Sequence, residues 1–312
     1  MSGTAQRLRW SIGLPKPGVA TASPDTLAAI ARAIESAGFD GVWVSDHPFP
    51  VDMSAPVETG PGGARKLGAG HQDWDPFVSL AWLGALTQRL MLHANAVVLP
   101  YRSPFVVAKA AATVQHLSRG RLILSIAAGY LKAEFDALGV DIGARTELTE
   151  EGVTALRAAW RGEPLWMSSP HWKVEGNAAL PAPDPQPPLW RAGNSRTAIA
   201  HAARAFDGWT PFEVTAEDAR ATHTAPLDAR TGLAGKIALF RQLCAEVGRP
   251  QTLDVSLVRT NWNSWITRSR QDIRDELSNL QEMGVTWIVT SVATADGDEF
   301  ARRLETIHNI VS

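Results

Sequence analysis

A histidine stands at the end of an expected buried strand in the stretch GVWVSDHPFP, residues 41–50. The first half of this stretch is apolar and β-branched, which favours a buried strand, but an acid and an imidazole follow it. Burying even a neutral polar group without a hydrogen-bond partner costs roughly 2–7 kcal/mol. The strand is therefore expected to end at Asp46 and His47, and Pro48 favours an extended backbone at His47. An imidazole titrates near neutral pH, which suits it to donating or accepting a proton.

The orientation of His47 needs a partner that the stretch itself does not supply. Side chains alternate along a strand, so Asp46 and His47 are expected to point to opposite sides. A relay between these two neighbours is therefore not expected, and His47 has another orienting partner or none. The alternative interpretation is a histidine that only makes a loop hydrogen bond.

A second candidate stretch is LWRAGNSRTAIAHAARAFDGWTP, residues 189–211. It reads as a strand, then Gly193-Asn194-Ser195, then a helix that begins near Arg196. Glycine lets a ligand approach the backbone, Ser195 can cap the helix, and free amides at a helix start favour a bound phosphate. The alternative is a simple capped turn without a ligand.

A third candidate region joins two strands through one helix over residues 90–140. Asn95 interrupts the apolar run LMLHANAVV, and a polar side chain in a buried strand must find a partner or a ligand. Ala128-Gly129 follows the next strand and has no bulk to block a planar ring. Small residues chosen for tight packing explain that pair equally well.

Strands that alternate with helices must carry these residues. Candidate strands occupy residues 8–14, 41–45, 90–98, 122–127, 189–190, 207–210, 253–258 and 285–291. Alternation predicts parallel pairing with right-handed crossovers, and therefore a closed (β/α)8 barrel, whose active site lies at the carboxyl ends of the strands. The short fifth and sixth strands leave an open doubly wound sheet as the alternative. No Gly-x-Gly-x-x-Gly follows the first strand, which argues against a common dinucleotide-binding sheet.

The chain is expected to form one domain over residues 1–312, with insertions near 46–74, 161–188 and 211–230. Long loops in a compact domain are often functional, so these insertions are expected over the active site. The first two are expected to form the substrate pocket. Ser23-Pro24, Asp75-Pro76 and Ser103-Pro104 each place a capping residue before a proline, which predicts three helix starts.

Charge and composition favour small-molecule chemistry. The 312 residues carry 30 basic and 32 acidic side chains with no run of like charge, so neither nucleic acid nor an anionic membrane is an expected partner. The start of the chain lacks a secretory signal and no apolar run approaches ~20 residues, which predicts a cytoplasmic protein. The single cysteine, Cys244, is expected as a buried helical residue, and no metal site is expected.

Three motifs together resemble the luciferase-like oxidoreductases, a superfamily of (β/α)8 barrels that use flavin mononucleotide (FMN) or the deazaflavin F420. They are SDHPFP, the segment VVLPYRSPFVVAKAAATVQHLSRGRLILSIAAGYLKAEFDALGV, and AGNSRTAIAHAARAFDGWTP. The third and fourth strand regions look closest to the F420-dependent group. The resemblance spans nearly the whole chain and also implies a homodimer or a higher homo-oligomer.

The resemblance implies a role for each matching residue. His47 would face the reactive centre of the ring with Asp46 beside it, as the catalytic pair. The cofactor would be bound by Asn95 and Ala96, at a bulge that sometimes has a non-proline cis peptide, by Ala128 and Gly129 near the ring, and by Gly193, Asn194 and Ser195 at the phosphate. One departure is Ala192-Gly193, where relatives often have two glycines.

The resulting hypothesis is hydride transfer between C5 of F420 and a carbon of a small organic substrate, with His47 handling the proton. The alternatives are an FMN-dependent monooxygenase that uses oxygen, and a flavin-binding barrel without turnover. F420 has an acidic tail beyond its phosphate, so a protein that selects it should offer basic groups. The candidates are Arg65, Lys66, Lys132, Arg191 and Arg196.

Overall fold

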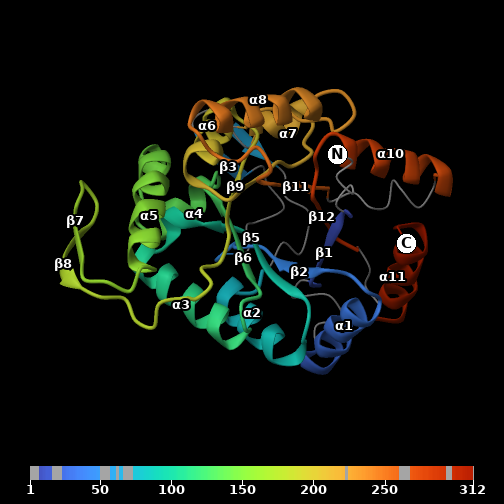
Figure 1. Cartoon of the computed structure of the whole chain (residues 1–312), viewed down its shortest axis with the longest axis horizontal. Coiled ribbons are helices and arrows are strands. Elements are labelled where there is room, and N and C mark those ends of the chain that lie inside the picture. The colour runs from blue at the N-terminus through green and yellow to red at the C-terminus, as the bar shows by residue number, and fades with distance from the viewer. Residues whose placement is uncertain are drawn as a thin grey trace.

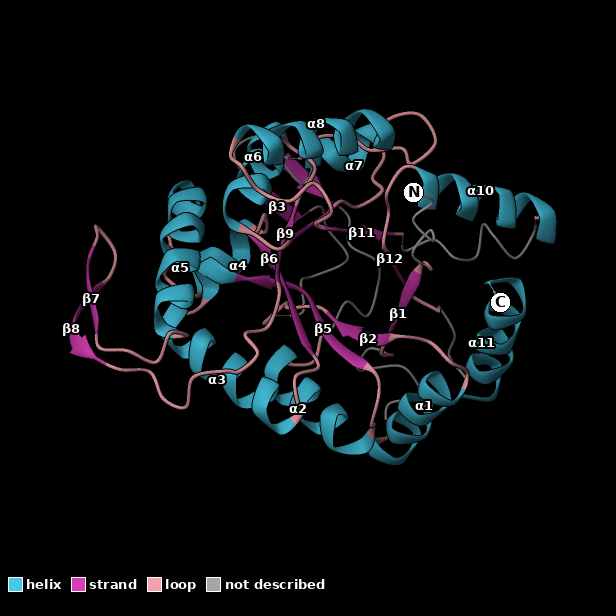
Figure 2. Cartoon of the chain, in the orientation of Figure 1, coloured by secondary structure: helices cyan, strands magenta, loops and turns pink. Residues whose placement is uncertain are grey.

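Short buried strands alternate with amphipathic helices and close into a barrel, which Figures 1 and 2 show as central strands ringed by helices. The computed structural model describes residues 7–15, 23–49, 57–60, 63–65, 73–221, 224–259, 268–292 and 297–311. The barrel strands are β1 (Arg9–Gly13), β2 (Gly41–Val44), β5 (Met91–Val98), β6 (Leu122–Ala127), β9 (Leu189–Ala192), β10 (Gly208–Thr210), β11 (Asp254–Val258) and β12 (Trp287–Thr290). All eight expected strands are present.

The order of the strands around the barrel is β1-β12-β11-β10-β9-β6-β5-β2. Every neighbouring pair is parallel, and β1 closes the barrel by pairing with both β12 and β2. The prediction of a (β/α)8 barrel is therefore confirmed, and the open sheet is excluded. The fifth strand, β9, extends two residues beyond the expected pair and ends at Ala192.

Helices link the strands on the outside of the barrel. They are α1 (Pro24–Ser36), α2 (Pro76–Leu86), α3 (Pro104–Leu117), α4 (Lys132–Ala137), α5 (Arg145–Ala159), α6 (Arg196–Ala205), α7 (Ala216–Ala221), α8 (Leu233–Glu246), α10 (Arg270–Glu282) and α11 (Gly297–Val311), with 3-10 turns η1 (Leu99–Tyr101) and η2 (Ile142–Ala144). In the part of the chain that the structure describes, no helix is both long and apolar enough to span a lipid bilayer.

The three expected helix starts are confirmed. The Ser23 side chain accepts from the backbone of Thr26 at the start of α1, and Asp75 accepts from two backbone amides at the start of α2. Helix α3 begins at Pro104 without a side-chain hydrogen bond from Ser103. On α8, Cys244 is fully buried as expected.

The predicted insertions contain small elements of their own. The first contains the antiparallel strands β3 (Val57–Gly60) and β4 (Gly63–Arg65). The second contains the hairpin of β7 (Leu165–Ser168) and β8 (Lys173–Asn177), which projects from the body of the molecule beside α5 in Figure 1. The third contains α7.

Candidate active site

A cavity of about 900 Å³ opens at the carboxyl ends of β2, β5, β6, β9, β10 and β11. This is the end of a barrel at which enzymes of this fold carry their reacting groups. Of the predicted site residues, Asp46, His47, Asn95, Ala96, Ala128, Gly129, Gly193 and Ser195 line the cavity. Asn194 does not line it, because its side chain donates hydrogen bonds to backbone oxygens within the protein.

His47 has an orienting partner, and that partner is Glu134. The side chain of His47 is 13% exposed, and its Nδ1 lies 3.0 Å from Glu134 Oε1 and 3.2 Å from Oε2. The ring of Tyr130 meets the imidazole edge-on, with the ring centroids 6.1 Å apart. The question that the sequence left open is thus answered by a carboxylate from a different element.

Glu134 lies in the first turn of α4 and is 1% exposed. It also accepts a hydrogen bond of 2.7 Å from the Tyr101 hydroxyl. Burial and the charge of Glu134 both raise the pKa of Tyr101, so the phenol stays protonated and remains a donor. Sequence reasoning missed Glu134, because an acid in a first helical turn is usually solvated beside the helix dipole.

Asp46 is buried and contacts the protein through both carboxylate oxygens. The backbone N–H of Val98 donates to Oδ2 at 3.1 Å, and Arg102 donates to Oδ1 at 2.7 Å. Arg102 also donates to Asp75, which caps α2. Burial raises the pKa of Asp46, although Arg102 and the Val98 amide act in the opposite direction. These contacts tie the end of β2 to β5 and α2, while a direct catalytic role of Asp46 stays a prediction.

Asn95 and Ala96 lie at an irregularity of β5. The register against β6 shifts between Asn95 and Val97, and the Asn95-Ala96 peptide is cis, as the resemblance implied. The Asn95 side chain lines the cavity, and within the described ranges it has no hydrogen-bond partner. Its amide is therefore positioned to interact with a ligand in the cavity.

Gly129 is required by its surroundings. Its φ is +82°, and a Cβ there would lie 2.6 Å from Val98 Cγ1 and 2.9 Å from Phe135 Cε2. Ala128 and Gly129 both line the cavity. The small residues at this turn therefore serve both interpretations: they allow tight packing, and they leave the cavity wall without bulk.

In the turn after β9, Gly193 and Ser195 line the cavity, whereas Asn194 makes hydrogen bonds within the protein. Gly193 has φ +134°, and Ser195 caps α6 by accepting from the Ala198 amide at 3.1 Å. The Asn194 side chain instead donates to Phe212 O at 2.7 Å and to Ala225 O at 3.1 Å, and accepts from Phe212 N. Asn194 is fully buried and anchors the turn, so the structure does not bring its side chain to the cavity.

Arg191 is a buried cation at the same wall of the cavity. It is 7% exposed, its Nη1 donates to the backbone oxygens of Ile126 and Ala192, and its Nε has no hydrogen-bond partner among the described residues. No described carboxylate forms an ion pair with it. Burial lowers the pKa of Arg191 to about 10, against the opposing charge of Glu150, so the side chain is still positive at neutral pH.

The other basic residues that were expected to contact the acidic tail of F420 are not placed in the cavity by the described part of the structure. Lys132 pairs with Asp136 at 2.5 Å, and Arg196 is exposed on α6 and does not line the cavity. Lys66 lies outside the described residues, as does the side chain of Arg65. Arg145, which sequence reasoning missed, does line the cavity.

One expectation about the insertions was wrong. No residue of 161–188 lines the cavity, whereas several residues of 211–230 do. The reason is connectivity: residues 161–188 follow α5 and lead into β9, so they enter a strand from its amino end. Residues 211–230 follow β10 and therefore lie at its carboxyl end.

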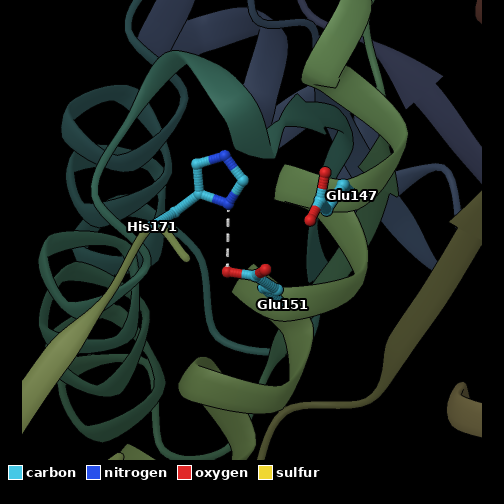
Figure 3. A group of neighbouring side chains, drawn as sticks. All are labelled: Glu147, Glu151 and His171. Atoms are coloured by element: carbon cyan, nitrogen blue, oxygen red, sulfur yellow. Dashed lines mark hydrogen bonds and ion pairs between the residues drawn. The ribbon is translucent and has the colours of Figure 1, made fainter. Parts of the chain in front are cut away.

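Figure 3 shows a second cluster of ionisable side chains, Glu147, Glu151 and His171, none of which lines the cavity. Ligand atoms of Glu147, Glu151 and His171 all lie within 4.8 Å of one another. Glu151 accepts from the Ser169 hydroxyl at 2.7 Å and lies 3.1 Å from His171 Nδ1. These contacts hold the loop between β7 and β8 against α5, and this account needs no metal ion.

Solved structures share this fold. A monooxygenase, RslO1, from Streptomyces bottropensis matches with a TM-score of 0.74 and 18% identity, over 97% of this chain and 98% of that one. An F420-dependent secondary alcohol dehydrogenase, in complex with an F420-acetone adduct, matches with a TM-score of 0.71 and 13% identity, over 98% and 99%. At these identities the likeness concerns the fold.

Curated sequences are similar over much of the chain. An uncharacterized protein of Mycobacterium tuberculosis is 28% identical over 289 residues, which cover 90% of this chain and 92% of that protein. The phthiodiolone/phenolphthiodiolone dimycocerosates ketoreductase of Mycobacterium bovis is 29% identical over 187 residues, which cover 57% of this chain and 48% of that protein. The family model for luciferase-like monooxygenases matches residues 11–309, so this barrel, with its cavity at the strand ends, belongs to the luciferase-like monooxygenase family.

Proposed function

We propose that this protein is an oxidoreductase that binds coenzyme F420 and transfers a hydride between its C5 carbon and a carbon of a small organic substrate. One observation carries the proposal. One cavity has an oriented imidazole, His47, on one wall, and on another a buried cation, Arg191, that forms no ion pair with a carboxylate in the described ranges. The first suits proton transfer and the second suits an anion.

The residues present fit such a cofactor. Among the described residues Arg191 forms no ion pair with an acid, Gly193 lines the cavity, and the N-terminus of α6 adds amides that favour an anion. These groups would hold the phosphate. Asn95, Ala96, Ala128 and Gly129 would lie along the ring, since they line the same cavity. Arg145 is a further cation for the acidic tail.

The protein's contribution is orientation and a proton. When bound, F420 supplies the carbon that gives or takes the hydride. His47 then gives a proton to, or takes one from, the substrate atom that gains or loses negative charge. Asp46 holds the end of β2 through Val98 and Arg102 and so maintains the position of His47.

The relatives suggest which substrates to try first. Two similar proteins are known as a secondary alcohol dehydrogenase and a ketoreductase, names that describe alcohol and ketone chemistry. We therefore propose secondary alcohols and the corresponding ketones as the first substrate panel.

The second candidate function is an FMN-dependent monooxygenase, which the similarity to RslO1 favours. In that case His47 would direct protons during the reaction with oxygen. A cofactor-binding barrel without turnover is the third possibility, and the oriented His47-Glu134 pair counts against it.

The test is an anaerobic reaction of the purified protein with F420 and the alcohol panel. We expect the visible absorbance of oxidised F420 to fall when a substrate is added. Consumption of oxygen with reduced FMN, and no reaction with F420, would support the monooxygenase instead. Cofactor binding without any substrate-dependent absorbance change would support the third possibility.

Self-association is also proposed, as a homodimer or a higher homo-oligomer. Light scattering coupled to size exclusion would give the mass in solution, and a mass of one chain, 33.6 kDa, would contradict this proposal.

A further inference from the structure

His47, Glu134 and Tyr101 come from three segments that follow three different strands. His47 follows β2, Tyr101 lies in η1 after β5, and Glu134 lies in α4 after β6. Glu134 is in contact with both others, at 3.0 Å from His47 Nδ1 and 2.7 Å from the Tyr101 hydroxyl. A buried carboxylate therefore joins the imidazole at the cavity to a phenol behind it.

The donors and acceptors in this group are determined by chemistry. A carboxylate only accepts hydrogen bonds, and the Tyr101 hydroxyl remains a donor because its pKa is raised. Glu134 therefore accepts from Tyr101 and also from His47, which places a hydrogen on Nδ1 of the imidazole. In the neutral ring the other nitrogen, Nε2, is then the one that carries the lone pair.

The surroundings hold the group in place. Tyr101 packs edge-on against Phe135, with the ring centroids 4.9 Å apart. Phe135 is fully buried and leaves no room for a Cβ at Gly129. Tyr130 meets the His47 ring edge-on from the adjacent turn. The carboxylate of Glu134 is thus fixed by its neighbours before any ligand binds.

We infer that Glu134, held by Tyr101, is a positioning residue that selects the Nδ1–H tautomer of His47 and fixes the orientation of its ring. Nε2 is then the atom that exchanges a proton with a ligand in the cavity. This inference rests on the proposed role of His47 in proton transfer, but its first test needs neither cofactor nor turnover.

The first experiment is nitrogen NMR of the histidine side chains in the ligand-free protein, at a pH where the His47 imidazole is neutral. The chain has eight histidines, and the signal missing from His47→Gln identifies His47. We expect the Nδ1–H tautomer in the parent and a mixture of tautomers in Glu134→Gln, because an amide can either accept from Nδ1 or donate to it. An Nε2–H tautomer in the parent, or no change in the variant, would overturn the inference.

The second experiment measures turnover. Glu134→Gln should lower kcat by about 10- to 100-fold, the range known for removing the hydrogen-bond partner of a metal-bound histidine, with cofactor affinity within several-fold of the parent. Tyr101→Phe should have the same sign with a smaller effect, and it serves as the test if Glu134→Gln does not fold. An unchanged kcat in both variants, where His47→Ala does lose turnover, would overturn the inference.

Glu151 provides a matched control. It also accepts from a hydroxyl, of Ser169, and contacts a histidine Nδ1, of His171, but outside the cavity. Glu151→Gln should leave kcat unchanged, and an equal loss there would reduce the Glu134 effect to general stability and overturn the inference. If His47→Ala keeps full turnover while the NMR result holds, the proposed function fails and the tautomer assignment stands.

Discussion

Two walls of the same cavity differ in whether their buried charged groups have partners within the protein. On the wall of β2, β5 and β6, Asp46 is paired with Arg102, and Glu134 is hydrogen-bonded to both His47 and Tyr101. On the wall of β9, Arg191 is as deeply buried, yet no described carboxylate neutralises it.

The difference separates residues that the protein has already positioned from a residue that awaits a ligand. A buried charge without a partner costs free energy in the ligand-free protein, and an anion that binds beside it recovers part of that cost. The first wall should therefore determine the rate of reaction and the second the affinity for the cofactor.

The largest expected effect lies on the first wall. His47→Ala should lower turnover by about 10²–10⁴-fold, the usual range for losing a general acid or base, while cofactor affinity stays within several-fold. His171→Ala is the control, because His171 also lies beside a glutamate but away from the cavity. Steady-state kinetics on a substrate identified in the alcohol and ketone panel would measure both, and full turnover in His47→Ala would leave His47 with only a loop hydrogen bond.

On the second wall, Arg191→Met should weaken cofactor binding by about 10- to 100-fold, the range expected for a charge-assisted hydrogen bond. Turnover at saturating cofactor should change little, and the ligand-free protein should not lose thermal stability, because a buried unpaired charge is removed. Arg196→Met is the matched control, since Arg196 is exposed and does not line the cavity. Equal affinities in the two variants would place the anion elsewhere.

Acid sensitivity should reflect two histidines that are buried as neutral rings. Burial lowers the pKa of His93 to about 3, and burial, Arg191 and Arg204 lower that of His201 to about 4. Below pH 6.5 the unfolded chain binds protons that the folded chain does not, so stability is lost as pH falls. Each histidine should cost about 2 kcal/mol between pH 7 and pH 5, which urea unfolding would measure.

The pKa values of these two histidines also respond differently to the charge on the β9 wall. His93 lies in β5 and its pKa is lowered by burial alone, whereas His201 lies in α6 under the charge of Arg191. Arg191→Met should therefore raise the pKa of His201 and leave that of His93 unchanged, as followed by NMR. No change at His201 would mean that the Arg191 charge is already compensated.

Local patterns in the sequence predicted much of the fold, because strands, caps and prolines act over a few residues. The caps Ser23 and Asp75 and the places of the eight strands were recognisable in this way, whereas the end of β9 lay two residues beyond the expected one. Glu134 was not, since its burial depends on Tyr101 and His47, which are 33 and 87 residues away. The prediction that 161–188 forms part of the pocket was wrong, because the length of a loop does not show at which end of the barrel it lies; this segment precedes β9.

The central claim, that this cavity binds F420 in preference to FMN, is tested most directly by titrating the cofactor-free protein with both cofactors and following fluorescence. At low salt F420 should bind more tightly than FMN, and its affinity should fall more steeply as salt rises, because contacts of the acidic tail with exposed cations are screened. Arg191→Met should weaken the binding of both cofactors. Tighter binding of FMN, with oxygen consumed once it is reduced, would contradict the claim and make the monooxygenase the better description.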